Sequence, residues 1–241
     1  MVDSLQITSA IAGFGPSIAL LYYTVSKYTY PKVKKPFFDD TKIFKFFALG
    51  IVLGMIIFAL EDWGQGADET LVASAVLFAV MEELMKLVIL NFPRFQRKVD
   101  TAFYGLTLGL GIATTYTFAS VYVSLTNPEL ENPGLLEMVG YSLLGLQFVF
   151  LHGATTTMIG VGVVRRELRA YVSEALLVHL GYNLLMIVFF AEIEPWSLMG
   201  LGAASALVVY AYYRIHTQSL PALIRDAKRL SLRTDVKAAS R

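Results

Sequence analysis

The chain has 241 residues, of which 56% are hydrophobic and only 16% are charged, and its mean hydropathy is +0.58. Because soluble domains carry about 25% charged residues, this composition argues against a soluble globular protein and predicts surroundings made largely of lipid. The absence of cysteine excludes disulfides and thiolate chemistry. The formal net charge of +1 is uninformative as a total, whereas the distribution of charge along the chain is decisive.

Seven apolar stretches are long enough, or nearly so, for membrane-spanning helices, which need about 20 mostly apolar residues. They cover residues 7–25, 43–60, 70–92, 101–126, 138–164, 170–191 and 195–213. The second is the weakest, because its uncharged part, residues 46–60, is short. Since backbone groups cannot stay unpaired in hydrocarbon, the pattern predicts an all-α transmembrane bundle of about seven helices. The connections are too short for a second domain, so we expect residues 1–241 to form one transmembrane domain.

Basic and acidic connections alternate along the chain. The first, third and fifth connections contain Lys27, Lys32, Lys34, Lys35, Lys42 and Lys45, then Arg94, Arg97 and Lys98, then Arg165, Arg166 and Arg169. The second, fourth and sixth have acids but no basic residue: Glu61, Asp62, Asp68 and Glu69, then Glu129, Glu131 and Glu137, then Glu192 and Glu194. Every Lys and Arg except Lys86 therefore falls on one side, and short basic loops stay cytoplasmic. We predict an N-terminus outside and a C-terminus in the cytoplasm.

The last part of the chain, residues 214–241, reads as a basic cytoplasmic tail. Within it, residues 220–232 interleave Leu, Ala and Ile with Arg and Lys. This pattern fits an amphipathic helix on the inner leaflet and equally fits a solvated basic tail.

Several polar residues lie inside the predicted spans, where a charged side chain costs about 2.5–3.5 kcal/mol near the bilayer centre. They are Glu82, Glu83, Lys86, His152, His179 and Asn183, with Asp100 and Glu174 nearer the ends. Helical spacing lets Lys86 pair with either glutamate and puts His179 and Asn183 on one face. Phe148 shares a face with His152 in the same way. Ionisable groups in such places are candidates for function.

The candidates are predicted to meet at one depth in the membrane. Glu83 lies nine residues before the end of its span and His179 nine residues after the start of its own, so both are about 13 Å from the cytoplasmic end. His152 precedes Arg165 by thirteen residues, or about 20 Å. We expect the cluster to lie somewhat to the cytoplasmic side of the midplane, with a water-filled vestibule opening to the cytoplasm.

Each candidate also has a purely structural interpretation. A single His or Asn in a membrane helix is usually a hydrogen bond between helices, but two histidines at matching depth beside a Glu-Glu pair favour a functional site. Asp100 is expected to cap its helix or to pair with Arg97 or Lys98, and Glu174 to pair with Arg169 or to reach water. Six glycines are expected to let two helices approach closely: Gly105, Gly109, Gly111, Gly153, Gly160 and Gly162.

Three motifs on separate helices carry a family resemblance. Glu82-Glu83-Leu84-Met85-Lys86, then Phe148-x-x-x-His152, then His179-x-x-x-Asn183 resemble the superfamily of intramembrane proteases that includes CAAX prenyl-proteases and PrsW. Lys86, Asp100, Tyr104-Gly105, Gly109-Leu110-Gly111 and the run His152…Thr156…Gly160 look more like the PrsW branch. The resemblance covers residues 79–183. The chain departs from a PrsW-like pattern at Tyr116 and Thr117, where such chains tend to carry Glu-Asn.

The resemblance implies an intramembrane endopeptidase of glutamic or metal-dependent type. Glu82 or Glu83 would be the general base that activates water, His152 would position that water, and His179 and Asn183 would stabilise the oxyanion, with Lys86, Phe148 and Asp100 in support. If a metal takes part, Glu83, His152 and His179 would hold Zn²⁺ with water at the fourth position. The superfamily equally allows a metal-free mechanism, towards which we lean, so the cofactor is expected to be none or Zn²⁺.

The expected substrate is a membrane-embedded or lipid-anchored protein, with the bilayer as the other partner and no nucleic acid. The resemblance implies a prokaryotic plasma membrane. Two further classes stay open. The same helices could form a non-catalytic scaffold, like the scaffolding subunit of gamma-secretase, which the superfamily also resembles. Buried carboxylates and histidines also serve as proton relays in transporters, although the internal repeats common in transporters are not visible in this sequence.

Overall fold

The computed structural model describes residues 4–33, 36–64, 71–127, 134–191 and 193–239, and side chains outside 62–64, 136 and 230–239. Within these ranges the regular structure is entirely helical, which confirms the predicted fold class. The helices are α1 (Ser4–Val25), α2 (Asp40–Gly64), α3 (Leu71–Leu90), α4 (Asp100–Leu125), α5 (Leu135–Arg165), α6 (Leu168–Phe190), α7 (Ser197–Arg214) and α8 (Leu220–Ala239). A short π-helical segment, η2 (Ile215–Ser219), joins α7 to α8.

Six of the helical segments are long and apolar enough to cross a membrane, which identifies an integral membrane protein. They are α1, α2, α4, α5, α6 and the continuous helix that begins with α7. The second predicted stretch, expected to be the weakest, becomes α2 and is the most apolar of the six. Its uncharged part is short, as the sequence indicated, but the helix begins at Asp40 and so reaches a spanning length by including Lys42 and Lys45 in its first turns. Helix α3 is the exception among α1–α7. Its 20 residues include three charged ones, Glu82, Glu83 and Lys86, which is more than the six spanning segments carry in their apolar parts.

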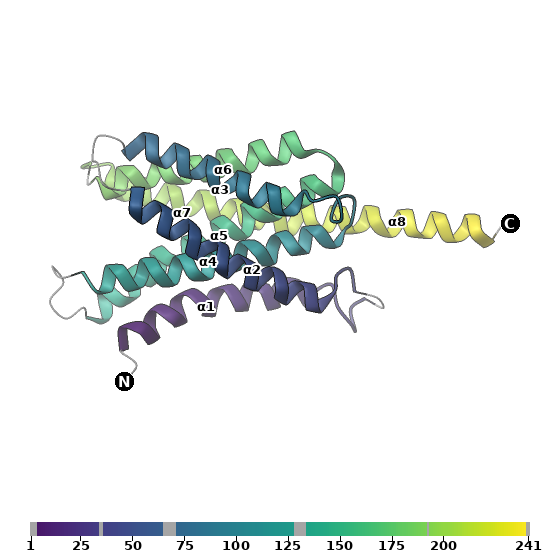
Figure 1. Ribbon diagram of the computed structural model, residues 1–241, viewed down its shortest axis with the longest axis horizontal. Helices are drawn as coiled ribbons and strands as arrows, with labels where there is room; N and C mark the ends of the chain where they lie inside the picture. Colours follow the sequence, from purple (N-terminus) through teal and green to yellow (C-terminus); the bar gives the residue numbers. More distant parts are fainter. Residues whose placement is uncertain (1–3, 34–35, 65–70, 128–133, 192, 240–241) are drawn as a thin grey trace.

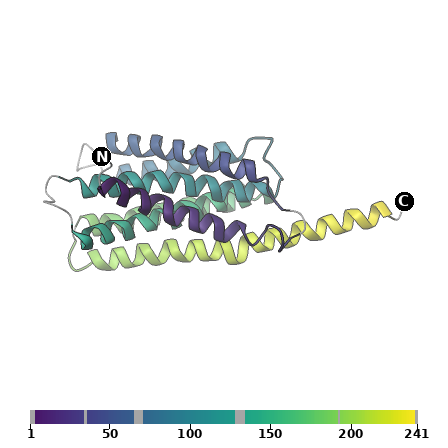
Figure 2. The ribbon, with the colours of Figure 1, turned by 90° about the horizontal axis from the view of Figure 1, so that it is seen from below.

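The helices run along one long bundle with the two chain ends at opposite ends of it (Figures 1 and 2). Helices α4 and α5 form the centre: α1 and α2 pack against α4, while α6 and α7 pack against α5. Helix α3 packs mainly against α6 and also touches α5. This arrangement brings α3, α5 and α6 together, as the matching depths of their polar residues require.

The charged loops gather at the two ends of the bundle. We call the end from which α8 projects the basic end, because residues 26–33 and 91–99 and the α5–α6 turn lie there (Figure 1). The opposite end is the acidic end, although the acids Asp68, Glu69, Glu129, Glu131 and Glu192 lie outside the described residues, as do Lys34, Lys35 and Arg241. The cytoplasmic location of the basic end stays a prediction from the charge distribution.

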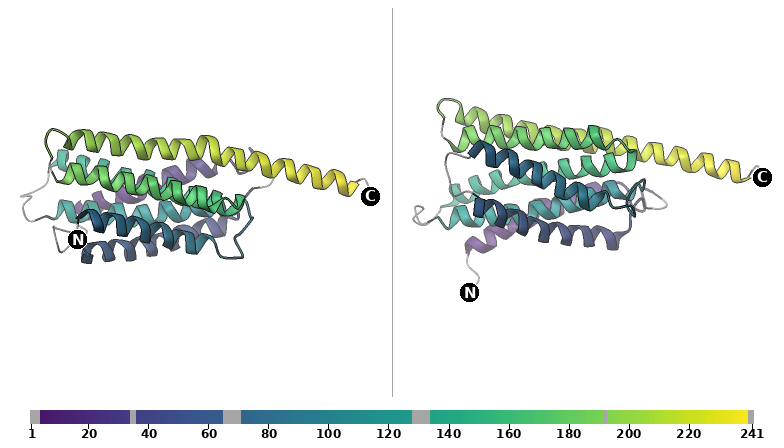
Figure 3. Two further views of the ribbon diagram at one scale, coloured as in Figure 1. Left: turned by 90° about the horizontal axis from the view of Figure 1, so that it is seen from above. Right: turned by 45° about the horizontal axis from the view of Figure 1, so that its top comes forward.

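The C-terminal tail is helical over residues 220–239. Of the two interpretations of its sequence, only the amphipathic helix required this. Helix α8 continues α7 in line and leaves the bundle along its long axis (Figure 3), so it does not turn into the plane of a leaflet. Near its start, Arg165 at the end of α5 donates a hydrogen bond to Asp226 at 3.2 Å.

Close contact between α4 and α5 depends on three of the six glycines. A Cβ on Gly105 would lie 2.6 Å from the carbonyl oxygen of Thr156, and one on Gly160 would lie 2.8 Å from that of Thr101. Gly109 faces the His152 backbone in the same way. The other three predicted glycines, Gly111, Gly153 and Gly162, approach α2, α7 and α6 instead. The α4–α5 contact therefore fixes the height of His152 in the bundle.

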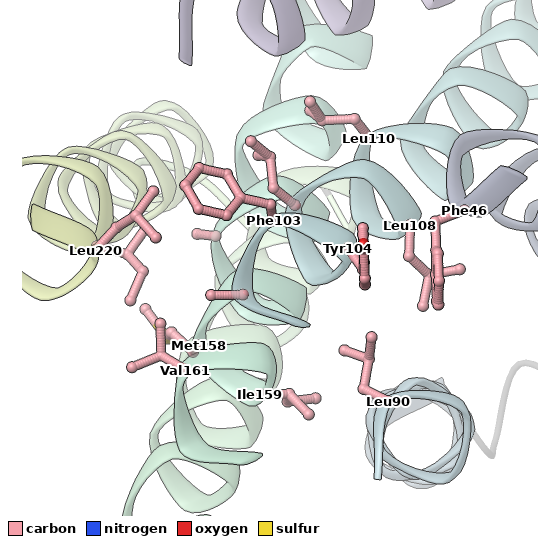
Figure 4. Close-up of a cluster of buried hydrophobic side chains, with 14 of the residues drawn as sticks. Phe46, Leu90, Phe103, Tyr104, Leu108, Leu110, Met158, Ile159, Val161 and Leu220 are labelled. Carbon is pink, nitrogen blue, oxygen red and sulfur yellow. The ribbon is translucent and has the colours of Figure 1, made fainter. Parts of the chain in front are cut away.

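Large apolar side chains fill the bundle towards the basic end, where α2 and α4 begin and α3 and α5 end, and several of them are labelled in Figure 4. We call this level the apolar layer and define it by Phe46, Leu90, Phe95, Tyr104, Leu108 and Ile159, all buried. The rings of Phe46 and Tyr104 are stacked, with centroids 4.8 Å apart, and Phe95 meets Phe46 edge-on at 5.2 Å. This layer lies one helical turn from Lys86 and bears directly on how the polar residues can be reached.

Candidate functional site

The buried ammonium group of Lys86 is the centre of the polar cluster. Its Nζ donates to Glu83 Oε1 at 2.7 Å, to His152 Nδ1 at 3.1 Å and to Thr155 Oγ1 at 3.4 Å. Glu82 is a more distant partner, with its Oε2 at 3.8 Å. The predicted pairing within α3 is thus present, and it is tighter with Glu83 than with Glu82. Thr155, one turn beyond His152, was not expected to take part.

The histidine of α6 joins the same cluster from the other side. His179 Nδ1 lies 2.7 Å from Glu83 Oε1, and its Nε2 lies 3.5 Å from Glu82 Oε1. The two histidine rings face each other nearly at right angles, with centroids 5.6 Å apart. The structure therefore brings Glu82, Glu83, His152 and His179 from three helices to one place, as their predicted depths indicated.

The two adjacent glutamates have different surroundings, which the sequence did not distinguish. Glu83 lies between Lys86 and His179 and does not reach the neighbouring cavity. Glu82 lines that cavity together with His152 and His179. Its Oε2 atom is buried and makes no hydrogen bond to any residue that the structure describes. Glu82 is thus the carboxylate placed to meet water or a ligand.

The cavity has a volume of about 480 Å³ and lies between five helices. Its walls come from residues 58–61 of α2, 71–82 of α3, 116–124 of α4, 141–152 of α5 and 179–190 of α6. In each helix these residues belong to the half that points to the acidic end. Three wall residues at the acidic ends of their helices, Leu71, Val123 and Phe190, are 48%, 52% and 66% exposed. The cavity thus leads from the polar cluster towards the acidic end.

The prediction of a water-filled vestibule that opens at the basic end was wrong. Between the polar cluster and the basic end stands the apolar layer, whose Leu90 is fully buried and whose Tyr104 is 1% exposed. Depth counted from the helix ends suggested that the nearer face would be open. It could not reveal that large aromatic and aliphatic side chains fill that shorter path.

Introduced cysteines can check this access route, because the chain has none of its own. We expect S120C and S124C, at cavity-lining positions of α4, to react with an impermeant thiol reagent applied at the acidic end. T41C, at the exposed start of α2, is the matched control for the basic end and should react only with reagent applied there. Labelling of S120C only from the basic end would contradict the assignment.

Two residues of the site were missed at the sequence level. Glu61 was assigned to an acidic connection, but it lies within α2, is only 8% exposed and lines the cavity. Tyr116 donates a hydrogen bond from its hydroxyl to Glu61, and its ring packs edge-on against Phe148 with centroids 4.6 Å apart. The only available signal was the position of Tyr116, where the chain departs from the PrsW-like pattern.

The remaining predicted residues divide between the site and elsewhere. Asn183 and Phe148 line the cavity, and Asn183 Nδ2 donates to the Ala75 carbonyl at 3.1 Å, which ties α6 to α3. Asp100 lies at the basic end, away from the site, and accepts a hydrogen bond from Tyr104 at 3.1 Å rather than pairing with Arg97 or Lys98. Glu174 pairs with Arg214, not with Arg169 as expected, because α7 passes beside α6 at that level.

The proposed zinc ligands do not fit a metal site in this arrangement. Glu83 Oε1 and His152 Nδ1 are both engaged by the Lys86 ammonium, and His179 Nδ1 is engaged by Glu83. The nitrogen and oxygen atoms thus converge on a cationic side chain and on one another. Over the described part of the chain, no group of three or more His, Cys, Asp or Glu residues is arranged to hold a metal ion. We therefore derive no step through a metal.

The chain was also compared with models of known protein families, with curated proteins and with solved structures, and none of the three comparisons gave a match.

Proposed function

We propose that the protein is an intramembrane endopeptidase that hydrolyses a peptide bond in a membrane-embedded or lipid-anchored protein, using water activated by Glu82. The observation that carries the proposal is the placement of Glu82. It is a buried carboxylate with an oxygen that makes no hydrogen bond to a described residue, and it faces a cavity beside two histidines. Glu83 also has a buried oxygen without a hydrogen bond to a described residue, but Glu83 does not line the cavity, so the cavity is what distinguishes Glu82.

The division of roles follows from the hydrogen bonds. Glu82 would take a proton from water as the water oxygen attacks the carbonyl carbon. Because an ammonium group only donates, His152 accepts at Nδ1 and its ring hydrogen is on Nε2 in the neutral form. That N–H is available to water or to the oxygen of the scissile carbonyl. On α6, His179 donates its Nδ1 hydrogen to Glu83, so its neutral ring has no second hydrogen to give. Asn183, whose Nδ2 has a second hydrogen beyond the one given to Ala75, can donate to the carbonyl oxygen as it develops negative charge.

Glu83 and Lys86 act as positioning residues in this mechanism. Their ion pair is buried at 2.7 Å and contacts both histidines, so it fixes the rings that surround Glu82. Groups held in this way need no reorganisation as charge develops, which is the main source of electrostatic catalysis. The resemblance in residues 79–183 supports the same reaction class.

The cavity walls support an apolar substrate. Apart from Glu61, Glu82 and the histidines, the walls consist mainly of aromatic and aliphatic side chains, such as Phe78, Leu144, Met186 and Ile187. A cavity of this kind holds an apolar segment or a lipid chain by burial alone, with a few polar groups to fix its orientation. The substrate is therefore expected to enter from the membrane near the acidic end.

The test is hydrolysis by the purified full chain in lipid vesicles that contain a library of membrane-spanning peptides. We expect cleavage that H152A and H179A each reduce by about 10² or more, and that survives a metal chelator. Loss of cleavage on chelation, restored by stoichiometric zinc, would replace the metal-free mechanism. No cleavage of any peptide, with stable capture of one partner protein, would favour the scaffold. Solute-dependent proton flux that needs Glu82 would favour a transporter.

A further inference from the structure

A second carboxylate reaches the site from a helix outside the recognised motifs. Glu61, near the end of α2, is buried and lines the same cavity as Glu82. The two carboxylates therefore share one buried space beside the α2–α3 interface. Tyr116 on α4 donates its hydroxyl hydrogen to the Glu61 carboxylate. Nothing in the motif-based assignment uses either Glu61 or Tyr116.

We propose that Glu61 is the general acid of the reaction and works as a pair with Glu82. The inference rests on the proposed hydrolase function and deepens it. Two carboxylates that share a buried site do not both ionise readily, so one of the pair keeps its proton. Such a pair can take a proton at one oxygen while it releases one from another, as two-carboxylate hydrolases do.

The reaction balances with these two residues and one water. Glu82, ionised, takes a proton from water as the water oxygen forms a bond to the carbonyl carbon. Glu61, protonated, gives its proton to the peptide nitrogen as the C–N bond breaks and the amine leaves. The proton now on Glu82 then returns to Glu61 through the cavity that both side chains line, which restores the starting state. The products are a carboxylic acid and an amine.

The structure holds Glu61 firmly enough for this role. The Tyr116 ring that supports it packs against Phe148 and lies 5.9 Å, centroid to centroid, from the His152 ring. Tyr182 on α6 closes the same wall, with its ring 6.0 Å from that of Phe148. Glu61 therefore shares the cavity with Glu82 of α3, and Tyr116 of α4 ties it to the aromatic wall of α5 and α6.

An amide and an activated aryl ester of the same membrane peptide separate the acid from the base. An amine must be protonated to leave, whereas an aryl oxide leaves without a proton. We expect E61Q to lose about 10²–10⁴-fold in kcat on the amide and no more than a few-fold on the ester. E82Q should lose activity on both substrates. E174Q, a carboxyl-to-amide change on a residue that does not line the cavity and pairs with Arg214, should keep both.

The outcomes are decisive in either direction. Equal losses by E61Q on amide and ester, or full activity on the amide, would overturn the proposal. E61D and Y116F extend the test if E61Q does not fold: E61D should recover amide activity, and Y116F should lower the amide rate more than the ester rate. An unchanged amide-to-ester ratio in both would count against Glu61. If the wild type hydrolyses neither substrate while it folds normally, the proposed function itself fails.

Discussion

The variant E82Q is expected to lower kcat by about 10³-fold without unfolding the protein. Gln keeps the shape of the side chain but cannot take a proton from water, and a positioned general base contributes about 10²–10⁴-fold. The Oε2 atom of Glu82 makes no hydrogen bond to a described residue, and the nearest cation is 3.8 Å away. Little native structure therefore depends on its charge, so the loss should be confined to catalysis.

The neighbouring variant E83Q is the matched control. It makes the same chemical change one residue away, on a glutamate that does not line the cavity. Its kcat should fall much less than that of E82Q, while the stability of the protein should fall more, because Lys86 loses its closest partner. The measurement is peptide hydrolysis in vesicles together with heat unfolding of each variant. Equal kcat losses in two equally stable variants would show that the cavity does not distinguish the glutamates.

The variant K86M is expected to lower the free energy of unfolding by about 3–5 kcal/mol, the cost of removing one partner from a buried ion pair. Lys86 is fully buried, and its loss would leave the carboxylate of Glu83 at 2.7 Å without its cation. The double variant E83Q/K86M removes both charges, so it should recover much of the lost stability. Unfolding of the three variants in detergent or bicelles measures the coupling between the two sites.

A double variant no more stable than K86M would contradict this account. It would mean that Lys86 stabilises the bundle through His152 and Thr155 rather than through Glu83. K42M provides a control for the loss of a lysine, because Lys42 is half-exposed and pairs with Asp39 at 4.0 Å. Exposed pairs of that kind contribute about 0–1 kcal/mol, so K42M should change stability little.

The helices and the convergence of Glu82, Glu83, His152 and His179 were predictable, because apolar length and helical rise are properties of each helix alone. Which glutamate faces the cavity was not. Adjacent residues on a helix point about 100° apart, so the answer depends on the rotation of α3 about its axis. That rotation is set by packing against α6 and α5, and by the bond from Asn183 to the Ala75 carbonyl.

Glu61 is a second residue whose place in the site could not be predicted from the sequence. It precedes Asp62 and a Gly-Gln-Gly run, which reads as the start of a loop, yet α2 continues through it to Gly64. Its burial depends on Tyr116, which is 55 residues away in the chain. The end of the bundle towards which the cavity leads could not be predicted for a similar reason. Residues of the apolar layer come from α2, α3, the α3–α4 connection, α4 and α5, and no single stretch shows that their side chains fill one level.

The polar composition of α3 has a consequence for how the chain is made. On insertion scales each charged residue at a helix centre costs about 2.5–3.5 kcal/mol, and α3 carries three of them. The Glu83–Lys86 pair cancels part of that cost within the helix. The partners on α5 and α6, however, follow Lys86 by 66 residues and Glu83 by 96 residues. We therefore expect α3 to stay at the translocon, or at the lipid–water boundary, during synthesis. It would enter the bundle only after α5 and α6, which carry the two histidines, have been made.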